Sequence, residues 1–325
     1  MTPKQAYIKT LNEIAQRYGS LEDATVRRAI GMLSQLRAQI ADQMLTVGGW
    51  DAYRLRELQR NVERLIAEFE AQLGANLRAA FVQTCRDGAL SVVEPLNALG
   101  MQGAFFQPNP AQVNILLDYS AELVKNITDE MRNGINMQIR LAALGQKSPM
   151  DAMRAVTDVL GVQARARAWA RRPPLVKGVA ARAETIVRTE MQRAFNLAHH
   201  SQQLATAKNV PGLLKAWVAT ADSRTRDSHL RAHMQYRQHP IPVAEPYVLT
   251  DPKLGRAELM MPGDPAAPIG FSVNCRCTQN TIHPQIGLIG SSLDGRIAAE
   301  WQRRQKEPKT KTQRRPRPRE AAANA

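Results

Sequence analysis

The chain has 325 residues, and its 44 Lys and Arg side chains outnumber its 29 Asp and Glu side chains, which gives a formal net charge of +15. This length accommodates about two domains, and a hydrophobic content of 44% provides a core, so wholesale disorder is excluded. The charge indicates a polyanionic partner, most simply nucleic acid. Aromatic residues make up only 5% of the chain, so phosphate contact is favoured over base stacking.

The sequence contains no run of 18 apolar residues and no apolar signal segment near residue 1. We therefore expect a soluble protein that is not exported by the standard signal and has no membrane partner. Three cysteines, two of them separated by one residue, do not form a disulfide framework, which favours a reducing compartment.

Apolar periodicity predicts two long helices in the first part of the chain. Apolar residues recur at three- and four-residue steps from Val26 to Met44 and again from Leu55 to Phe81. Gly48 and Gly49 separate the two stretches and act as helix stops, so an antiparallel helical hairpin is expected.

Three further helices are predicted before residue 210. The first covers about 111–144 and ends at Gly145. The second follows Ser148, which is placed to cap it, and continues to about residue 160. The third covers about 179–208.

The composition changes after this helix. Residues 213–219 suit a buried strand, 222–237 suit a helix that Asp222 caps, and 271–282 suit a second strand. The Pro- and Gly-rich stretch 239–270 is expected to be an irregular connection. These elements predict a small α+β module.

The predicted fold is therefore mainly α, with a helical N-terminal region at 1–144, an α+β module at 145–290 and a disordered basic tail at 291–325. Residues 1–160 contain 17 basic and 17 acidic side chains, so the whole excess of charge lies in the second half. The tail is either simply solvated or an arm that neutralises DNA phosphates without reading sequence. Its candidate nucleic-acid residues are Arg303, Arg304, Lys306, Lys309, Lys311, Arg314, Arg315, Arg317 and Arg319.

Four side chains of the module are candidate metal ligands: His229, His233, Cys275 and Cys277. The histidines are one helical turn apart, the cysteines lie on one face of a strand, and these are ligand types of tetrahedral zinc. A structural zinc would hold in place the long Pro- and Gly-rich connection between the histidines and the cysteines. However, the C-x-C spacing is less usual for zinc than C-x2-C, and the histidine pair lacks the Glu of a hydrolytic H-E-x-x-H site. The alternative to a metal site is a reduced cysteine pair that packs beside a hydrogen-bonded histidine. We expect no other cofactor.

Three other residues are interpreted as structural. Cys85 lies on the apolar side of the second long helix, where a buried thiol acts as a small hydrophobic group. His199 and His200 are adjacent near a helix end and are expected at the surface.

Three motif clusters occur in a recognisable order: RTEMQRAFN, WVATADSRTRDSH, and PGDP followed by NCRC. Each is weak alone, but their order and spacing resemble the Mu F-like phage minor head protein family, also called the phage head morphogenesis family. The residues that carry the resemblance are Arg188, Thr189, Glu190, Asn196, Trp217, Asp222, Arg224, Arg226, His229, Pro262, Gly263, Asp264, Asn274, Cys275, Arg276 and Cys277.

The resemblance implies a structural minor head protein of a tailed bacteriophage, present in few copies near the portal. It implies a role in procapsid and head assembly and in DNA packaging or DNA ejection, with non-specific contact to DNA. The implied partners are the portal protein, the major capsid protein or both, and packaged phage DNA through phosphate contacts. The implied location is the virion head, and the host cytoplasm during assembly.

No enzymatic activity is predicted. The chain has no phosphate-binding G-x4-G-K-[ST] loop and no G-x-G-x-x-G after a strand. Asp222, Asp227 and Asp264 are the only carboxylates near the motifs that could serve a nuclease, and Asp264 reads more simply as a turn residue. Two alternatives stay open: a metal-dependent hydrolase, and a DNA-binding virion protein ejected with the genome.

Overall fold

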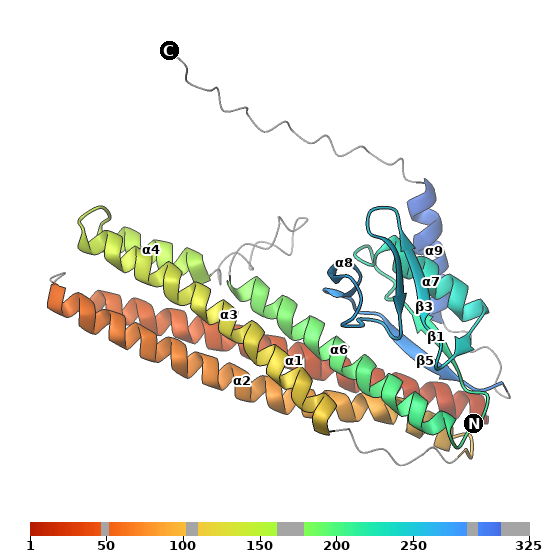
Figure 1. Cartoon of the computed structure of the whole chain (residues 1–325). Helices are drawn as coiled ribbons and strands as arrows, with labels where there is room; N and C mark the ends of the chain where they lie inside the picture. The colour runs from red at the N-terminus through yellow and green to blue at the C-terminus, as the bar shows by residue number, and fades with distance from the viewer. Residues whose placement is uncertain (47–51, 102–109, 161–178, 285–291, 307–325) are drawn as a thin grey trace.

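The structure is a computed structural model that describes residues 1–46, 52–101, 110–160, 179–284 and 292–306 (Figure 1). Its elements are, in order, α1 Pro3–Thr46, α2 Ala52–Asn97, α3 Pro110–Ala143, α4 Pro149–Leu160, α6 Val179–Ala207, β1 Leu214–Val218, α7 Asp227–Gln238, β2 Ile241–Pro242, β3 Tyr247–Asp251, β4 Gly255–Leu259, α8 Ile269–Ser272, β5 Thr278–Ile282 and α9 Ser292–Lys306. Long helices followed by short strands confirm the prediction of a mainly α fold with a small α+β module.

Helices α1 and α2 form the predicted antiparallel hairpin, which α3, α4 and α6 cover (Figure 1). Leu33, Ile40 and Ile66 are each 0% exposed, and they belong to one apolar core that all five helices share. Burying a side chain of this kind contributes about 1.5–3 kcal/mol. The apolar stripes therefore face one another. The predicted stop at Gly48 and Gly49 lies outside the described residues.

Local signals set the helix ends around α3 and α4 as predicted. Gly145 adopts a positive φ of 68°, and the N–H of Gln146 donates to the carbonyl of Leu141 at 3.0 Å, which closes α3 in the manner of a Schellman motif. Ser148 Oγ accepts the N–H of Asp151 at 3.1 Å and so caps α4.

Helix α6 lies between the helical bundle and the C-terminal module (Figure 1). Val187, Met191 and Phe195 on one side join the apolar core of the bundle. The opposite side is polar and also buried, and it contacts the module. Helix α6 therefore belongs to both halves of the molecule.

The C-terminal module, which in the structure comprises the elements from β1 to α9, contains a three-stranded antiparallel sheet in the order β2-β1-β5 and a separate β3–β4 hairpin. In the first sheet, Leu214 pairs with Pro242 on one side and with Ile282 on the other. Trp217 and Phe271 are fully buried in a second core that α7 and α9 help to close.

The expectation of an irregular connection over 239–270 is wrong, because this stretch contains β2, β3, β4 and the beginning of α8. A tight turn explains the hairpin. Asp251 Oδ1 accepts the N–H groups of Lys253 and Leu254, and Gly255 follows with a φ of 79°. Asp251 and Gly255 therefore form a tight turn between β3 and β4, whereas the composition of this stretch alone suggested an irregular loop.

The predicted start of α7 is also wrong, since the helix begins at Asp227 and not at Asp222. Asp222 Oδ1 accepts the N–H groups of Arg224 and Thr225 at 3.0 Å, which forms a separate turn before the helix. Asp222 therefore caps a turn and does not share a helix face with His229.

The predicted strand over 271–282 is shorter than expected. Phe271 lies in α8, and β5 begins at Thr278, after both cysteines. Between them Asn274 has a φ of 53°, a left-handed conformation that interrupts an extended strand.

The first part of the predicted disordered tail is an ordered helix, which corrects that expectation for 292–306. In α9, Ile297 is 0% exposed and packs with Trp301 against the core of the module. Arg304 donates to Asp227 at 2.6 Å and to the carbonyl of Thr225 at 2.7 Å. Residues 307–325, with the remaining candidate nucleic-acid side chains, lie outside the described residues.

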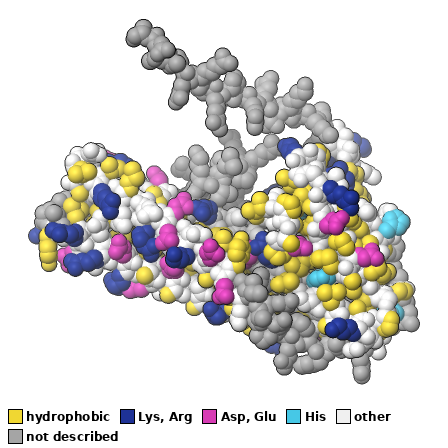
Figure 2. Space-filling view, viewed as in Figure 1, with side chains coloured by type: hydrophobic (Ala, Val, Ile, Leu, Met, Phe, Trp, Pro, Cys, Tyr) yellow, Lys and Arg dark blue, Asp and Glu magenta, His cyan; other side chains and the backbone are white. Residues whose placement is uncertain are grey.

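Figure 2 shows Lys and Arg interspersed with Asp and Glu along the helical bundle, which agrees with the balanced charge of residues 1–160. Hydrophobic side chains are more frequent over the module on the same face. None of the described helices combines the length and the apolar character that crossing a bilayer requires.

Candidate functional site

Two of the three motif clusters, which are far apart in sequence, meet along the polar side of α6. Asn196 Nδ2 donates to the carbonyls of Pro262 and Cys277, both at 2.9 Å. Thr189 Oγ1 accepts the N–H of Asn274 at 3.0 Å. The PGDP and NCRC segments are therefore both fixed to the RTEMQRAFN helix.

These contacts belong to a row of buried polar side chains, which we call the polar stripe of α6. The stripe comprises Thr189, Gln192, Asn196, His199 and Gln203, and each is at most 6% exposed. Steps of three and four residues place them on one face of the helix. All five hydrogen-bond to the module.

Gln192 and Gln203 belong to this stripe although no functional role was predicted for them from the sequence. Gln192 Nε2 donates to the carbonyl of Cys277 at 2.9 Å, and Gln203 Nε2 donates to Thr281 Oγ1 at 3.0 Å. A signal existed, because polar residues here repeat with the same helical period that identified the apolar stripes.

The expectation that His199 and His200 lie at the surface is wrong, since they are 1% and 6% exposed. His199 Nδ1 lies 2.5 Å from Ser91 Oγ of α2, and its Nε2 lies 3.3 Å from Thr281 Oγ1 of β5. Burial lowers the pKa of His199 to about 3 and that of His200 to about 4. Both are therefore neutral at pH 7.

Glu190 and Arg193 form a buried ion pair on α6, with Arg193 Nη1 at 2.8 Å from Glu190 Oε1. Burial raises the pKa of Glu190, although the Arg193 guanidinium opposes the shift. Arg193 Nε also donates to the carbonyl of Gly263 at 3.3 Å, where a φ of 76° suits glycine. The pair therefore holds the PGDP turn.

Arg188 points the other way, toward α1. Its guanidinium pairs with Glu22, with Asp23 at 3.1 Å and with Glu184 at 3.1 Å. Burial raises the pKa of Glu22, and hydrogen bonding to Arg188 counters this. The first residue of the motif therefore ties α6 to the helical hairpin.

The WVATADSRTRDSH segment is held by a second set of charged contacts. Arg276 Nη2 donates to Asp222 Oδ1 at 2.8 Å. Burial disfavours the Asp222 carboxylate, but hydrogen bonds from Arg276 and the N–H of Arg224 outweigh it and lower its pKa to about 2. Arg226 Nη2 donates to the carbonyl of Val273 at 2.7 Å, whereas the side chain of Arg224 is exposed.

Asp264 acts as a turn residue, as predicted. Its Oδ2 accepts the N–H of Met260 at 2.8 Å, and its Oδ1 accepts the N–H of Ala266 at 2.9 Å. Each of the three candidate nuclease carboxylates therefore already bonds to a backbone N–H or to an arginine: Asp222 to Arg276, Asp227 to Arg304 and Asp264 to the N–H of Met260.

A thiol-imidazole cluster lies next to the motif contacts, formed by His229, Cys275 and Cys277. His229 Nδ1 is 3.3 Å from Cys277 Sγ and 3.6 Å from Cys275 Sγ, and the three residues are 1–3% exposed. Both cysteines are free thiols. A hydrogen bond from the Cys277 thiol, together with His229, holds the pKa of Cys275 well below its usual range. Trp217 packs edge-on against the imidazole, with ring centroids 5.3 Å apart.

His233 is not part of this cluster, so the structure brings together three of the four predicted ligands. His233 Nδ1 accepts the N–H of Ala219 at 3.3 Å, and its Nε2 lies 3.1 Å from Asp294. Burial lowers its pKa to about 4. Cys85 is 3% exposed on α2, which confirms it as a buried thiol, and burial raises its pKa to about 11.

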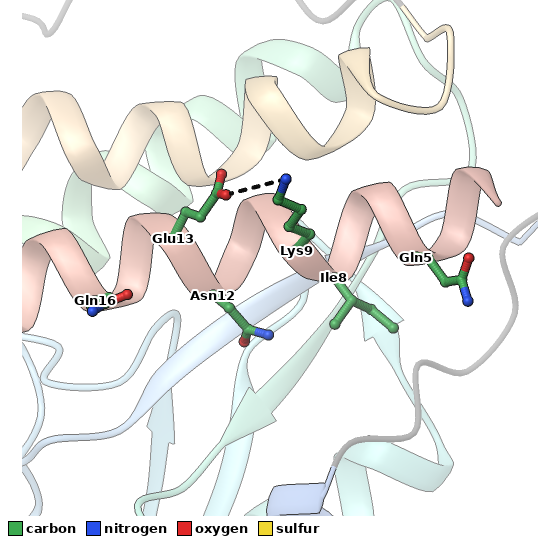
Figure 3. A pocket seen from close by; sticks show the side chains of 6 residues that line it. All are labelled: Gln5, Ile8, Lys9, Asn12, Glu13 and Gln16. Carbon is green, nitrogen blue, oxygen red and sulfur yellow. Dashed lines mark ion pairs between the residues drawn. The ribbon is translucent and has the colours of Figure 1, made fainter. Parts of the chain in front are cut away.

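A shallow hollow of about 360 Å³ lies elsewhere, on the outer face of α1 (Figure 3). It is lined by side chains of this one helix, among them Lys9 and Glu13, which pair at 3.8 Å. The ion pair joins neighbouring turns of the same helix. The hollow is therefore a surface feature of α1 and is separate from the motif contacts.

The geometry defines the site as a buried junction that joins a helical bundle to an α+β module. Residues 122–280, just under half of the chain, match the family model for phage Mu protein F like protein. This confirms the resemblance of these residues to the phage Mu F-like family. The match begins within α3 and ends within β5, so it includes the whole polar stripe. Searches of curated proteins and of solved structures gave no match.

Proposed function

We propose that the protein is a structural minor head protein of a tailed bacteriophage, which acts in procapsid and head assembly beside the portal. The observation that carries the proposal is the match over residues 122–280 together with the use of the motif side chains. Asn196, Arg193 and Asp222 bond to backbone groups of neighbouring loops, as residues of a structural junction do. This use supports a structural role over a catalytic one.

The end of the helical bundle remote from the module is the proposed docking surface for the portal or the major capsid protein. Figure 1 places the end of α1, the beginning of α2 and the α3–α4 turn together at this end. Leu45, Tyr53 and Leu144 are 64–71% exposed there. Large apolar side chains exposed together favour a protein partner.

Crosslinking of purified heads tests the partner. Lys147 lies in the α3–α4 turn at this end of the bundle, and we expect peptides that contain it to be linked to the portal protein. Links to the major capsid protein alone would contradict a position beside the portal.

A substitution pair tests the docking surface. Leu144→Lys should lower the number of copies incorporated into heads, because it places a charge in the apolar contact. Val82→Lys is the matched control, since Val82 is 54% exposed but lies on the other half of α2, nearer the module. Equal incorporation of both variants would contradict the docking surface.

The proposed contact with packaged DNA depends on the basic C-terminal residues and has no sequence specificity. Two of the predicted residues already have partners within the chain, because Arg303 pairs with Glu300 and Arg304 pairs with Asp227 and Glu300. The contact is therefore proposed for Lys306 and the basic residues after it.

Truncation after residue 306 tests this contact while α9 is retained. DNA retention should weaken, and the log-log salt slope should become shallower by about 0.9 for each phosphate that the tail no longer neutralises. A full-length control with the Lys and Arg of 307–325 replaced by Gln should behave like the truncation. An unchanged slope would exclude the tail as the DNA contact.

A further inference from the structure

We propose that His229, Cys275 and Cys277 bind one zinc ion as a structural centre, with a water molecule as the fourth ligand. The proposal goes beyond the assembly role and does not depend on it. It rests on the arrangement of the three donor atoms, on the contacts that preform it and on the contrast with other buried histidines.

The donor atoms have the spacing of zinc ligands. Bonds of about 2.0 Å to nitrogen and 2.3 Å to sulfur at a tetrahedral angle leave the two ligand atoms about 3.5 Å apart. The observed distances from His229 Nδ1 to Cys277 Sγ and Cys275 Sγ are 3.3 and 3.6 Å, and the donor atoms all lie within 4.8 Å of one another.

The loop that carries the cysteines is held independently of any metal. Gln192 and Asn196 donate to the carbonyl of Cys277, and the N–H of Cys275 donates to the carbonyl of Ser272 at 3.1 Å. Thr220 Oγ1 donates to the carbonyl of Arg276 at 2.9 Å, between the two cysteines. Such outer contacts orient metal ligands and lower the cost of forming the site.

His229 also differs from two other buried histidines. His199 and His233 each contact oxygen or nitrogen partners through both ring nitrogens. The partners of His229 Nδ1 are the two sulfur atoms, and its Nε2 has no hydrogen-bond partner among the described residues. His200 Nδ1 also has no hydrogen-bond partner among the described residues, so the feature that sets His229 apart is its contact with two sulfur atoms.

Three protein ligands and a water molecule are also the ligand set of catalytic zinc sites, but charge and burial favour a structural centre here. Two thiolates neutralise the charge of Zn²⁺, so the loaded site adds no net charge to the core around Trp217 and Phe271. Burial of all three ligands leaves no path for a polymeric substrate. The metal would join α7 to the segment before β5, two elements that the intervening hairpin separates in sequence.

Metal analysis of the full chain, purified with a reductant and without chelator, tests the proposal. We expect about one zinc per chain, and loss of the metal in Cys275→Ser and Cys277→Ser. Cys85→Ser is the matched control for removal of a buried thiol, and His233→Gln is the control for the fourth predicted ligand. Both controls should keep the metal.

A spectroscopic titration covers the case in which the serine variants fail to fold. Metal-free wild-type protein titrated with Co²⁺ should develop thiolate-to-cobalt absorption with an end point near one equivalent, and Zn²⁺ should displace it. Three results would overturn the proposal: wild-type protein that neither contains nor takes up metal, metal retained by both serine variants, or a Cys275–Cys277 disulfide in the reduced preparation.

Discussion

In the helical bundle, apolar side chains of five helices fill one shared core, whereas at the junction with the module polar side chains of α6 bond to loop carbonyls. Phe81 and Leu36 represent the first kind of contact, and Asn196 represents the second. Apolar packing depends mainly on volume, so residues of similar size can replace one another. A buried hydrogen bond depends on the identity of the donor, because a carbonyl that loses its partner stays desolvated.

The largest expected effect lies in the bundle. Phe81→Ala should lower the free energy of unfolding by about 3–5 kcal/mol, because Phe81 is 1% exposed and its removal leaves a cavity. Urea denaturation measures the change. The matched control Phe81→Leu should cost much less. If both variants cost the same, volume would not be the property that matters in this region.

A smaller effect is expected at the junction, from a substitution that keeps the number and branching of the side-chain heavy atoms. Asn196→Leu should cost about 2–3 kcal/mol, because the carbonyl of Pro262 loses its donor while Cys277 keeps the bond from Gln192. Leu36→Met, the volume-conserving control in the bundle, should cost less than about 1.5 kcal/mol. Equal costs in the same denaturation experiment would remove the difference between the two regions.

Because His199 is buried in its neutral form at the junction, we expect the stability of the folded protein to fall at acidic pH. The folded-state pKa of His199 is about 3, below the ordinary value, so protons bind preferentially to the unfolded chain below about pH 6.5. Its contribution to stability is complete above about pH 6.5 and falls by at most about 1.4 kcal/mol per pH unit as the pH drops toward 3. Between pH 7 and 5 this amounts to about 1–2 kcal/mol.

Thermal unfolding of wild type and His199→Gln at pH 7, 6 and 5 measures this decrease. The wild-type melting temperature should fall more steeply with pH than that of the variant. Parallel curves would show that the pKa of His199 is not lowered in the folded state and would contradict this prediction.

The smallest effect is expected where α6 meets α1. Arg188→Met leaves Glu22, which is 8% exposed, without its cation. Because Arg188 is itself 27% exposed at its side chain, we expect a coupling energy of only about 1–2 kcal/mol. A double-mutant cycle with Glu22→Gln measures it. A coupling near zero would mean that apolar contacts alone hold α6 against the hairpin.

Local signals in the sequence predicted much of the fold. Apolar repeats predicted α1, α2, α3 and α6, and Gly145 and Ser148 marked helix ends where the structure has them. These predictions succeed because periodicity and capping depend on residues within a few positions of one another. The start of α7 was misplaced for a related reason: Asp222 forms a capping interaction in a turn as readily as at a helix end.

By itself, therefore, the sequence determined the helices, the order of the motifs and the resemblance to the Mu F-like family. Only the tertiary structure decided that His199 is buried, that the polar side of α6 is an interface, and that His229 meets the cysteines while His233 does not. The physical reason is distance along the chain. Gln192 and Cys277 are 85 residues apart, and whether their groups meet depends on the path of the chain through β1, α7 and β5.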